Sequence, residues 1–229
     1  MSVRIAVLAS GGGSNLQALL DAFNITDDSP ARVALVLSDR DDAGALERAR
    51  AAGVPAHVVP VRGRAEGEVA DETLARLEEH AVGLIALAGY LRLLPAAVVR
   101  RYPGRIVNIH PALLPAFGGP GMYGERVHAA VLASGTRVSG PTVHFVNERY
   151  DEGAILAQWP VPVLPHDTPA TLAARVLAVE HRLYPLVVAA LALGSHGVPA
   201  PESAAFHLSD DPAPGTAELL HVIRIPDSE

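Results

Sequence analysis

The chain has 229 residues, of which 49% are hydrophobic and 19% charged, and its formal net charge is -7 at pH 7. This composition suits a soluble α/β core, and the absence of cysteine excludes disulfides, a thiol nucleophile and thiolate metal sites. The negative charge argues against a nucleic-acid surface, and no uncharged apolar run approaches the ~20 residues that span a bilayer, so we expect a cytoplasmic protein with no nucleic-acid or membrane partner.

The first half of the chain alternates apolar runs with segments of helical periodicity. Residues 3–9 form a near-continuous apolar run followed by a Gly/Ser cluster, which is typical of a strand buried on both faces. Similar runs and helical patterns then alternate, with strands expected at 32–37, 83–88 and 105–109 and helices at 14–24, 43–52 and 68–80. This alternation predicts an α/β fold with a doubly wound, mostly parallel sheet and right-handed crossovers.

After the fourth apolar run the pattern changes to that of antiparallel strands. Residues 137–147 alternate between apolar and polar, and residues 153–163 follow after a short polar loop. Pro141, Pro160 and Pro162 lack an N–H donor, so these strands should lie at a sheet edge or carry bulges. We therefore expect an antiparallel C-terminal portion of the sheet.

A last helix should close the domain. Residues 169–192 are apolar at helical spacing, with Pro169 near the start and Gly194 past the end. We predict one domain over residues 1–194. Residues 195–229 are rich in Pro, Ser and Asp, and we expect them to form a tail packed on the domain, in which residues 217–225 could form one more strand.

The motif Asn108-Ile109-His110-Pro111 lies where a buried strand should end. Polar groups at the carboxyl edge of a parallel sheet line a crevice, because only loops cover that edge. Asn108 and His110 are two residues apart, so on an extended backbone their side chains share one face while Ile109 packs on the other. An amide donor and a titratable ring can then converge on one atom.

The segment Ser10-Gly11-Gly12-Gly13-Ser14-Asn15 joins the first predicted strand to the first helix. Consecutive glycines let the backbone approach an anion, and the free N–H groups at a helix start favour a phosphate. Ser14 or Asn15 could instead serve only as an N-cap, but a cap alone does not need three glycines. The segment lacks the GxGxxG pattern and the Lys of a P-loop, which favours a monophosphate over a dinucleotide or triphosphate.

Other polar residues are less informative alone. The Pro- and Gly-rich loop from Pro111 to Gly124 suits either a segment that folds over a ligand or packed connecting chain. Asp151 lies at a turn, where acidic residues are common. His144 lies inside an alternating strand, and the other histidines show no metal-ligand spacing, so we predict no metal site and treat most of them as surface or structural residues.

Taken in order, six segments resemble the glycinamide ribonucleotide formyltransferase family over about residues 3–192. They are SGGGSNLQALLDA, ERARAAGVP, LAGYLRLLP, GRIVNIHPALLP, TVHFVNERYDEGAILAQ and EHRLYPLV. The resemblance implies the formyltransferase, Rossmann-like form of the fold. It also implies transfer of the formyl group of 10-formyltetrahydrofolate, a co-substrate, to the amine of glycinamide ribonucleotide in purine biosynthesis.

The same resemblance implies a nucleotide-binding half at about 1–104 and a folate and catalytic half at about 105–194. It implies the catalytic trio Asn108, His110 and Asp151. Its ribonucleotide-binding residues would be Gly11, Gly12, Gly13, Ser14, Asn15 and Glu180. Its folate-binding residues would be Tyr90, Leu91, Arg92, Leu93, Leu94 and Val99.

The trio implies direct attack by the amine and a tetrahedral intermediate, with neither a metal nor a covalent enzyme intermediate. Asn108 and His110 would donate to the oxyanion, and a preorganised donor is typically worth ~3 kcal/mol. Asp151 would orient His110, help to move the amine proton through water and raise the pKa of His110.

This chain departs from the commonest family pattern in two places. Many members read PGLH after LLPAF, whereas this chain has a longer loop, Gly118–Gly124. Leu177 stands one turn before Glu180, where some relatives carry a polar or basic side chain. Arg62 and Arg64 are therefore candidates to complete the phosphate site.

Three other functions fit parts of the pattern. A formyltetrahydrofolate deformylase shares the trio but would carry an N-terminal regulatory domain, whereas the predicted sheet begins at Val3. A methionyl-tRNA formyltransferase would add a C-terminal domain and a basic surface. A non-catalytic nucleotide-binding module needs only the Gly-rich loop and leaves the trio unexplained. We expect a monomer or homodimer acting on small molecules.

Overall fold

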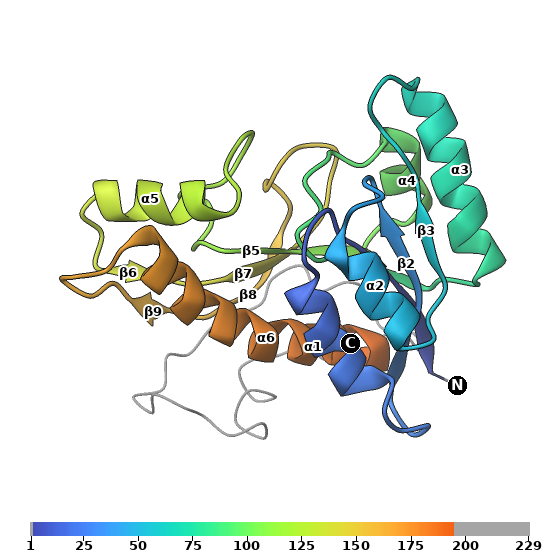
Figure 1. Cartoon of the computed structure of the whole chain (residues 1–229), viewed down its shortest axis with the longest axis horizontal. Helices are drawn as coiled ribbons and strands as arrows, with labels where there is room; N and C mark the ends of the chain where they lie inside the picture. Colours follow the sequence, from blue (N-terminus) through green and yellow to red (C-terminus); the bar gives the residue numbers. More distant parts are fainter. Residues whose placement is uncertain (1, 195–229) are drawn as a thin grey trace, which may run out of the picture.

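A seven-stranded sheet in the order β3-β2-β1-β4-β5-β7-β8 forms the centre of the computed structural model, which describes residues 2–194 (Figure 1). The first five strands are parallel, and β7 and β8 join them antiparallel. This confirms the predicted doubly wound, mostly parallel sheet with an antiparallel portion. The strands of this sheet are β1 (Val3–Leu8), β2 (Ala31–Ser38), β3 (Ala56–Val58), β4 (Leu84–Leu87), β5 (Ile106–His110), β7 (Thr142–Phe145) and β8 (Ile155–Gln158).

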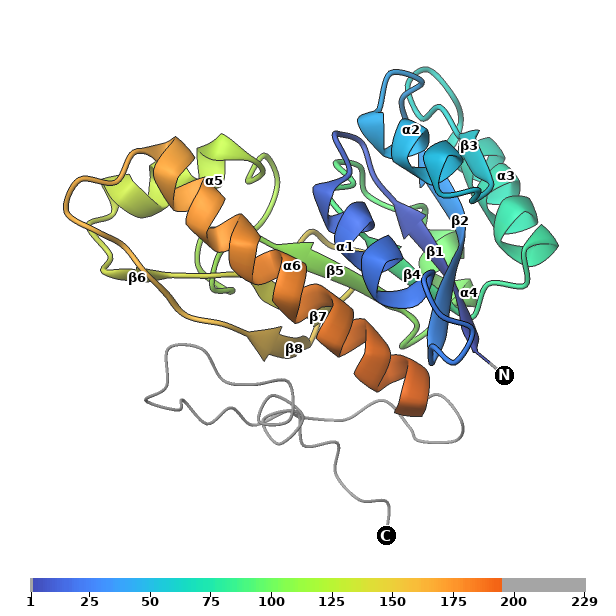
Figure 2. The ribbon, with the colours of Figure 1, turned by 60° about the horizontal axis from the view of Figure 1, so that its bottom comes forward.

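Helices cover both faces of the sheet. One buried cluster joins the sheet to α1, α2 and α6, and a second joins its other face to α3 and α4. Figure 2 shows α6 running beside α1 across the first of these faces. The helices are α1 (Ser14–Phe23), α2 (Gly44–Ala51), α3 (Glu66–Glu79), α4 (Ala96–Arg101), α5 (Glu125–Ala133) and α6 (Pro169–Gly194).

The double covering explains why the parallel strands read as continuous apolar runs. All four residues of β4 are buried, as are the last four of β1, because helices pack on either side of them. Tyr184 on α6 is fully buried, and its hydroxyl donates to the carbonyl oxygens of Leu87, the last residue of β4, and Val107 in β5. The last helix is thereby fixed to the two strands that lead to the candidate site.

The sequence pattern missed three short elements. Strand β3 has 3 residues, and helices α4 and α5 have 6 and 9. Segments this short contain at most about two and a half turns of a helix or one alternation of a strand, so their periodicity is weak. Helix α5 packs with the first turns of α6 in a third buried cluster.

The late strands are shorter than the alternation predicts. The run 137–147 divides into β6 (Val138–Ser139) and β7, and 153–163 divides into β8 and β9 (Val161–Pro162). Strands β6 and β9 pair in a separate two-stranded sheet. The division falls at Gly140 and Pro160. There the two segments approach so closely that a Cβ on Gly140 would overlap the Trp159 carbonyl. Strand β8 lies at the edge of the main sheet, as the prolines of the run 153–163 predict, although Pro160 and Pro162 themselves lie after β8.

Helix α6 is the one helix among residues 2–194 that is long and apolar enough to cross a membrane by length and composition. Its apolar side chains are used inside the fold, because Leu183, Tyr184, Val187 and Val188 are all buried in the main core. The predicted tail at 195–229, with its strand at 217–225, lies outside the described residues. The two predicted halves contribute to one continuous sheet.

Candidate active site

Strand β5 carries Asn108 and His110 to the carboxyl edge of the sheet. Both residues line a cavity of about 490 Å³, while Ile109 between them packs in the main core. The His110 side chain is almost fully buried, at 4% exposed. Because β5 ends here and the chain turns away at Pro111, two polar side chains can face a cavity without interrupting the core.

Asp151 reaches the same place from the loop between β7 and β8. Its backbone is left-handed, with φ of 55°, a conformation that Asp tolerates better than most residues. One carboxylate oxygen lies 3.6 Å from His110 Nδ1, and the other lies 3.6 Å from His144 Nε2. The structure therefore brings the three predicted catalytic residues together and places a second imidazole among them.

His144 is the residue of this cluster that sequence reasoning assigned to a structural role. It lies directly opposite Asn108 in the antiparallel pairing of β5 with β7. Its Nδ1 donates to the Phe145 carbonyl at 2.8 Å, so its Nε2 is left to accept from Asn108 Nδ2 at 3.1 Å. His144 thus fixes the orientation of the Asn108 amide. Strand pairing, which no single-strand pattern reveals, was the missing signal.

Residues 117–119 of the loop between Pro111 and Gly124 contact two members of the trio. His110 Nε2 donates to the Phe117 carbonyl at 2.9 Å, and the Gly119 N–H donates to Asp151 Oδ2 at 2.9 Å. A Cβ on Gly118 would lie 3.2 Å from Asp151 Cβ and 2.5 Å from Leu114 Cδ2. The predicted loop is therefore packed against the trio here, and glycine at 118 permits the close approach.

The expected rise in the His110 pKa is wrong. Burial of the ring lowers its pKa below the ordinary value, and the Asp151 carboxylate and the Phe117 carbonyl only partly oppose this. For Asp151, burial raises the pKa, but the two imidazoles and the Gly119 amide outweigh burial, so its pKa is lowered overall. At neutral pH the pair consists of a carboxylate and an uncharged imidazole.

The same cavity extends to Asn15 and Glu180. Asn15 Nδ2 donates to Glu180 Oε2 at 2.6 Å, which joins the first turn of α1 to α6. Glu180 is 7% exposed, and burial raises its pKa while the bond from Asn15 lowers it. Leu177, one turn earlier on α6, adds an apolar surface to this wall.

The remaining predicted ribonucleotide residues lie beside this cavity. Gly11, Gly12 and Gly13 precede α1, and Ser14 lines a neighbouring groove between α1, α2 and α6. Gly13 has φ of 75°, and its Cβ would lie 2.7 Å from Ala45 Cα, whereas no atom lies within 4 Å of a Cβ on Gly11 or Gly12. Gly13 is therefore required by packing, and the first two glycines keep the backbone open.

A smaller cavity of about 50 Å³ adjoins the first on its other side. It is lined by Tyr90, Arg92, Leu93 and Leu94, with Leu91 in the larger cavity. Val99 lines neither cavity and packs with the second core cluster.

Two polar contacts hold the loop that carries these residues. The Leu91 N–H donates to Ser10 Oγ at 3.0 Å, and Arg92 Nε donates to Asp39 at 2.9 Å. The loop is thereby fixed to the ends of β1 and β2.

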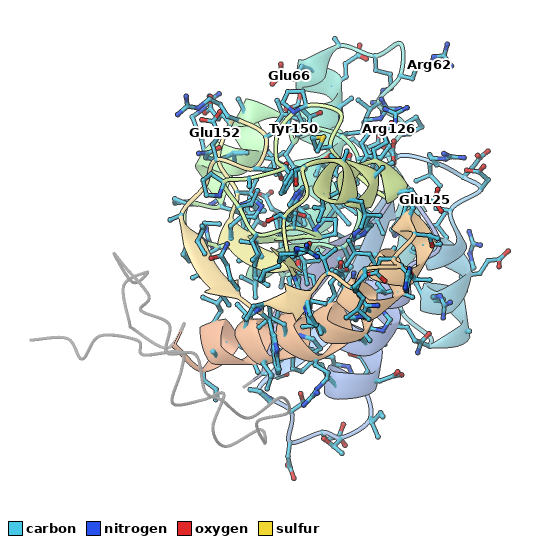
Figure 3. The ribbon with its side chains drawn as sticks, turned by 90° about the vertical axis from the view of Figure 1, so that its left-hand side faces the viewer. Arg62, Glu66, Glu125, Arg126, Tyr150 and Glu152 are labelled. Atoms are coloured by element: carbon cyan, nitrogen blue, oxygen red, sulfur yellow. The ribbon has the colours of Figure 1, made fainter. Side chains whose placement is uncertain are left out.

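The two cavities meet at the trio. Both are lined by Asn108 and Asp151, and both are lined by Tyr90 and Tyr150. Figure 3 shows Tyr150, from the loop before β8, and Arg126, from α5, along the upper side of the molecule where these loops gather. Within residues 2–194 no three His, Asp or Glu side chains are arranged to hold a metal ion.

A protein-family model described as formyl transferase matches residues 3–188, which include every residue of this site. The chain belongs to the formyl transferase family. Among relatives of this formyl transferase, the chloroplastic phosphoribosylglycinamide formyltransferase of Arabidopsis thaliana is 49% identical over 82% of this chain and 65% of its own length. The phosphoribosylglycinamide formyltransferase of Haemophilus influenzae is 40% identical over 81% of this chain and 85% of its own length.

Solved structures show the same fold. Glycinamide ribonucleotide transformylase 1 from Symbiobacterium toebii superposes with a TM-score of 0.78 at 45% identity, covering 84% of this formyl transferase and 89% of that chain. The chain spans slightly less than two thirds of the Arabidopsis protein, 65% of its length.

Proposed function

We propose that this formyl transferase moves the formyl group of 10-formyltetrahydrofolate to the amine of glycinamide ribonucleotide, giving formylglycinamide ribonucleotide and tetrahydrofolate. The observation that carries the proposal is the meeting of two cavities at Asn108 and Asp151. A transfer between two substrates needs both reacting atoms beside the same polar groups. The names of the relatives in Arabidopsis and Haemophilus support the same reaction.

The two substrates are assigned by the chemistry of the walls. The ribonucleotide occupies the larger cavity, with its ribose hydroxyls on the buried Glu180 carboxylate and its phosphate at the Gly-rich loop. The flat pteridine is assigned to the wall formed by residues 90–94, which borders both cavities and offers apolar side chains and backbone groups; the smaller cavity alone, at about 50 Å³, would hold only part of the ring. Both assignments leave the amine and the formyl carbon at the trio.

The reaction begins with attack of the amine nitrogen on the formyl carbon, which forms a tetrahedral intermediate. Negative charge develops on the former carbonyl oxygen. Asn108 has one amide hydrogen on His144 and a second one free to donate to this oxygen. The proton that the amine loses to Asp151 can be shared with His110, so the ring gains its charge as the oxyanion forms and gives the proton up again as the folate nitrogen leaves.

Proton transfer then completes the step. The attacking amine loses one proton and the folate nitrogen gains one, so no net proton is consumed. Asp151 is a carboxylate at neutral pH and is positioned to accept the amine proton and to return it, through water, to the leaving nitrogen. The bond that breaks joins the formyl carbon to the folate nitrogen.

Hydrolysis of the same folate is the second candidate, because the trio could equally activate water. The larger cavity favours transfer, since its volume of about 490 Å³ and its wall at Asn15 and Glu180 exceed what a water nucleophile needs. A cytoplasmic location stays a prediction from composition, and the small-molecule partners stay a prediction from the family resemblance.

One assay separates the two reactions. Tetrahydrofolate formation from 10-formyltetrahydrofolate is followed with and without glycinamide ribonucleotide. The formylated ribonucleotide is identified and quantified by mass spectrometry. The proposal expects tetrahydrofolate to form only with ribonucleotide and in equal amount to the formylated product. Equal rates in both arms, with formate released, would establish a hydrolase instead.

A further inference from the structure

We propose that Arg48 on α2 is the positioning residue of the phosphate site, which turns the N–H groups of the Gly-rich loop toward the anion and adds the positive charge. The inference rests on the proposed function, because the anion is the phosphate of the ribonucleotide. The sequence pattern pointed to Arg62 or Arg64 for this charge, and the contacts favour a different arginine.

Two hydrogen bonds join α2 to the loop. The Ala45 N–H donates to the Gly11 carbonyl at 3.0 Å, and Arg48 Nε donates to the Gly12 carbonyl at 2.8 Å. A trans peptide group is planar, so its N–H points away from its C=O. The N–H groups of Gly12 and Gly13 therefore point away from α2. Neither donates to another group within residues 2–194.

These two donors continue into the free N–H groups of the first turn of α1. A left-handed residue at Gly13 places successive N–H groups on one concave side, the geometry with which loops hold anions. The fixed carbonyls are thus the reason that this loop presents donors rather than acceptors. Removing the Arg48 bond would free the Gly12–Gly13 peptide to rotate.

Arg48 is itself held in place and carries an unneutralised charge. Its Nη1 donates to Gln17 Oε1 at 3.1 Å, and Gln17 Nε2 donates in turn to Asp21 at 2.8 Å. Among the described residues, Arg48 forms no ion pair with Asp or Glu. Its remaining N–H groups and its charge are therefore available beside the loop.

Other cations fit this role less well. All 18 basic residues of the chain are arginines, so no lysine can serve. Arg64 is bonded to Glu72 at 2.6 Å, and position 177 on α6 holds an apolar leucine. Figure 3 shows Arg62 extending outward at the upper edge of the molecule.

The test compares Arg48→Met and Arg48→Lys with Arg50→Met, which alters an exposed arginine on the same helix. Calorimetry measures binding of ribose 5-phosphate and of a folate, and steady-state kinetics measures KM and kcat. Charge-assisted bonds of this kind predict that Arg48→Met weakens ribose 5-phosphate binding by about 10- to 100-fold and raises the ribonucleotide KM similarly. Folate binding and kcat at saturation should stay within about twofold, as should every value for Arg50→Met. Arg48→Lys should recover part of the loss, because it restores charge without the planar fork.

Unchanged ribose 5-phosphate binding in Arg48→Met would overturn the inference. Equal weakening of folate binding would overturn it as well, because that result indicates a general structural defect. Failure of the wild-type chain to formylate the ribonucleotide would count against the proposed function alone, since the binding of ribose 5-phosphate does not depend on turnover.

Discussion

Asn15 donates a 2.6 Å hydrogen bond to Glu180 and so connects the start of α1 to α6 in the wall of the larger cavity. The carboxylate is buried, and burial raises its pKa against the opposing effect of the Asn15 bond. A buried carboxylate whose charged form is disfavoured costs stability at neutral pH. We infer that this charge is kept for the ligand rather than for the fold.

Replacing Glu180 with Gln should therefore stabilise the protein and weaken its ribonucleotide binding. The Glu180 carboxyl has a higher pKa in the folded protein than in the unfolded chain, so wild-type stability declines as pH rises through the folded pKa. The uncharged amide of Gln at position 180 removes this decline. Thermal unfolding at pH 7 should show a higher Tm, by about 2 to 4 °C per kcal/mol gained. Calorimetry should show ribonucleotide binding weakened about tenfold, as for the loss of a charge-assisted hydrogen bond, with folate binding unchanged. A lower Tm would contradict this account.

The Gly-rich loop should respond differently at adjacent positions. A Cβ on Gly12 meets no atom within 4 Å, so the fold should survive Gly12→Val while its branched side chain blocks the anion and raises the ribonucleotide KM. Gly13→Val meets Ala45 of α2 at 2.7 Å and requires a positive φ, so it should lose stability before any effect on KM can be read. Thermal unfolding and steady-state kinetics on both variants check this contrast, and similar stability losses in the two would contradict it.

Gly118→Ala should disturb the trio, although Gly118 itself lines neither cavity. Its Cβ would press on Leu114 and on Asp151 Cβ, which should displace the carboxylate relative to His110. We expect kcat to fall about tenfold or more, as for displaced catalytic groups, with ribonucleotide binding preserved. Gly67→Ala on α3 is the matched control, because no atom lies within 4 Å of its Cβ and alanine favours a helix. A wild-type kcat in folded Gly118→Ala would show that the loop does not position Asp151.

The elements of the fold could be predicted where burial requires a long run of apolar residues, and they were missed where the elements are short. Strands β1, β2 and β4 lie between two helical layers, so their apolar runs reveal them directly. Strand β6 has 2 residues and depends on pairing with β9, which is a tertiary contact. No local pattern encodes such a contact.

The residues of the site also divide into those that the sequence predicts and those that only the structure reveals. Asn108 and His110 are detectable because polar residues interrupt an apolar strand two positions apart. His144 and Arg48 act through partners 36 residues away in each case, Asn108 and Gly12, so only the folded chain reveals their roles. The pKa of His110 was misjudged because charge proximity can be guessed from a motif, whereas the extent of burial cannot.

The pH dependence of activity should follow an uncharged His110. Its pKa is below the ordinary value of 6.5, so kcat/KM should be constant at pH 6.5 and above and should decline only as pH falls through the lowered pKa, where the ring is already protonated and cannot take up the amine proton. Stability should fall over the same range, since the unfolded ring takes up its proton first. Asp151→Asn removes the charge that raises the His110 pKa and should lower that pKa further. An NMR titration of the ring reports both values directly, and a His110 pKa above 6.5 in the wild type would contradict the structure.

Asn108, His110 and Asp151 should act as one unit on the charge that appears during formyl transfer. Single-turnover rates with both substrates bound should fall at least about 100-fold in His110→Ala and in Asp151→Asn, as for the loss of a transition-state donor. The His110→Ala and Asp151→Asn double variant should lose much less than the two losses combined. Asp151→Asn should lose activity across the whole pH range, by far more than the accompanying shift of the His110 titration explains.

The most direct measurement is the single-turnover rate of His110→Ala at saturating ribonucleotide and 10-formyltetrahydrofolate, with the dissociation constant of each substrate determined on the same preparation. The account predicts a rate lowered about 100-fold or more while both dissociation constants stay within about threefold, because the ring acts mainly in the transition state. A folded variant that transfers the formyl group at close to the wild-type rate would contradict the assignment of the trio.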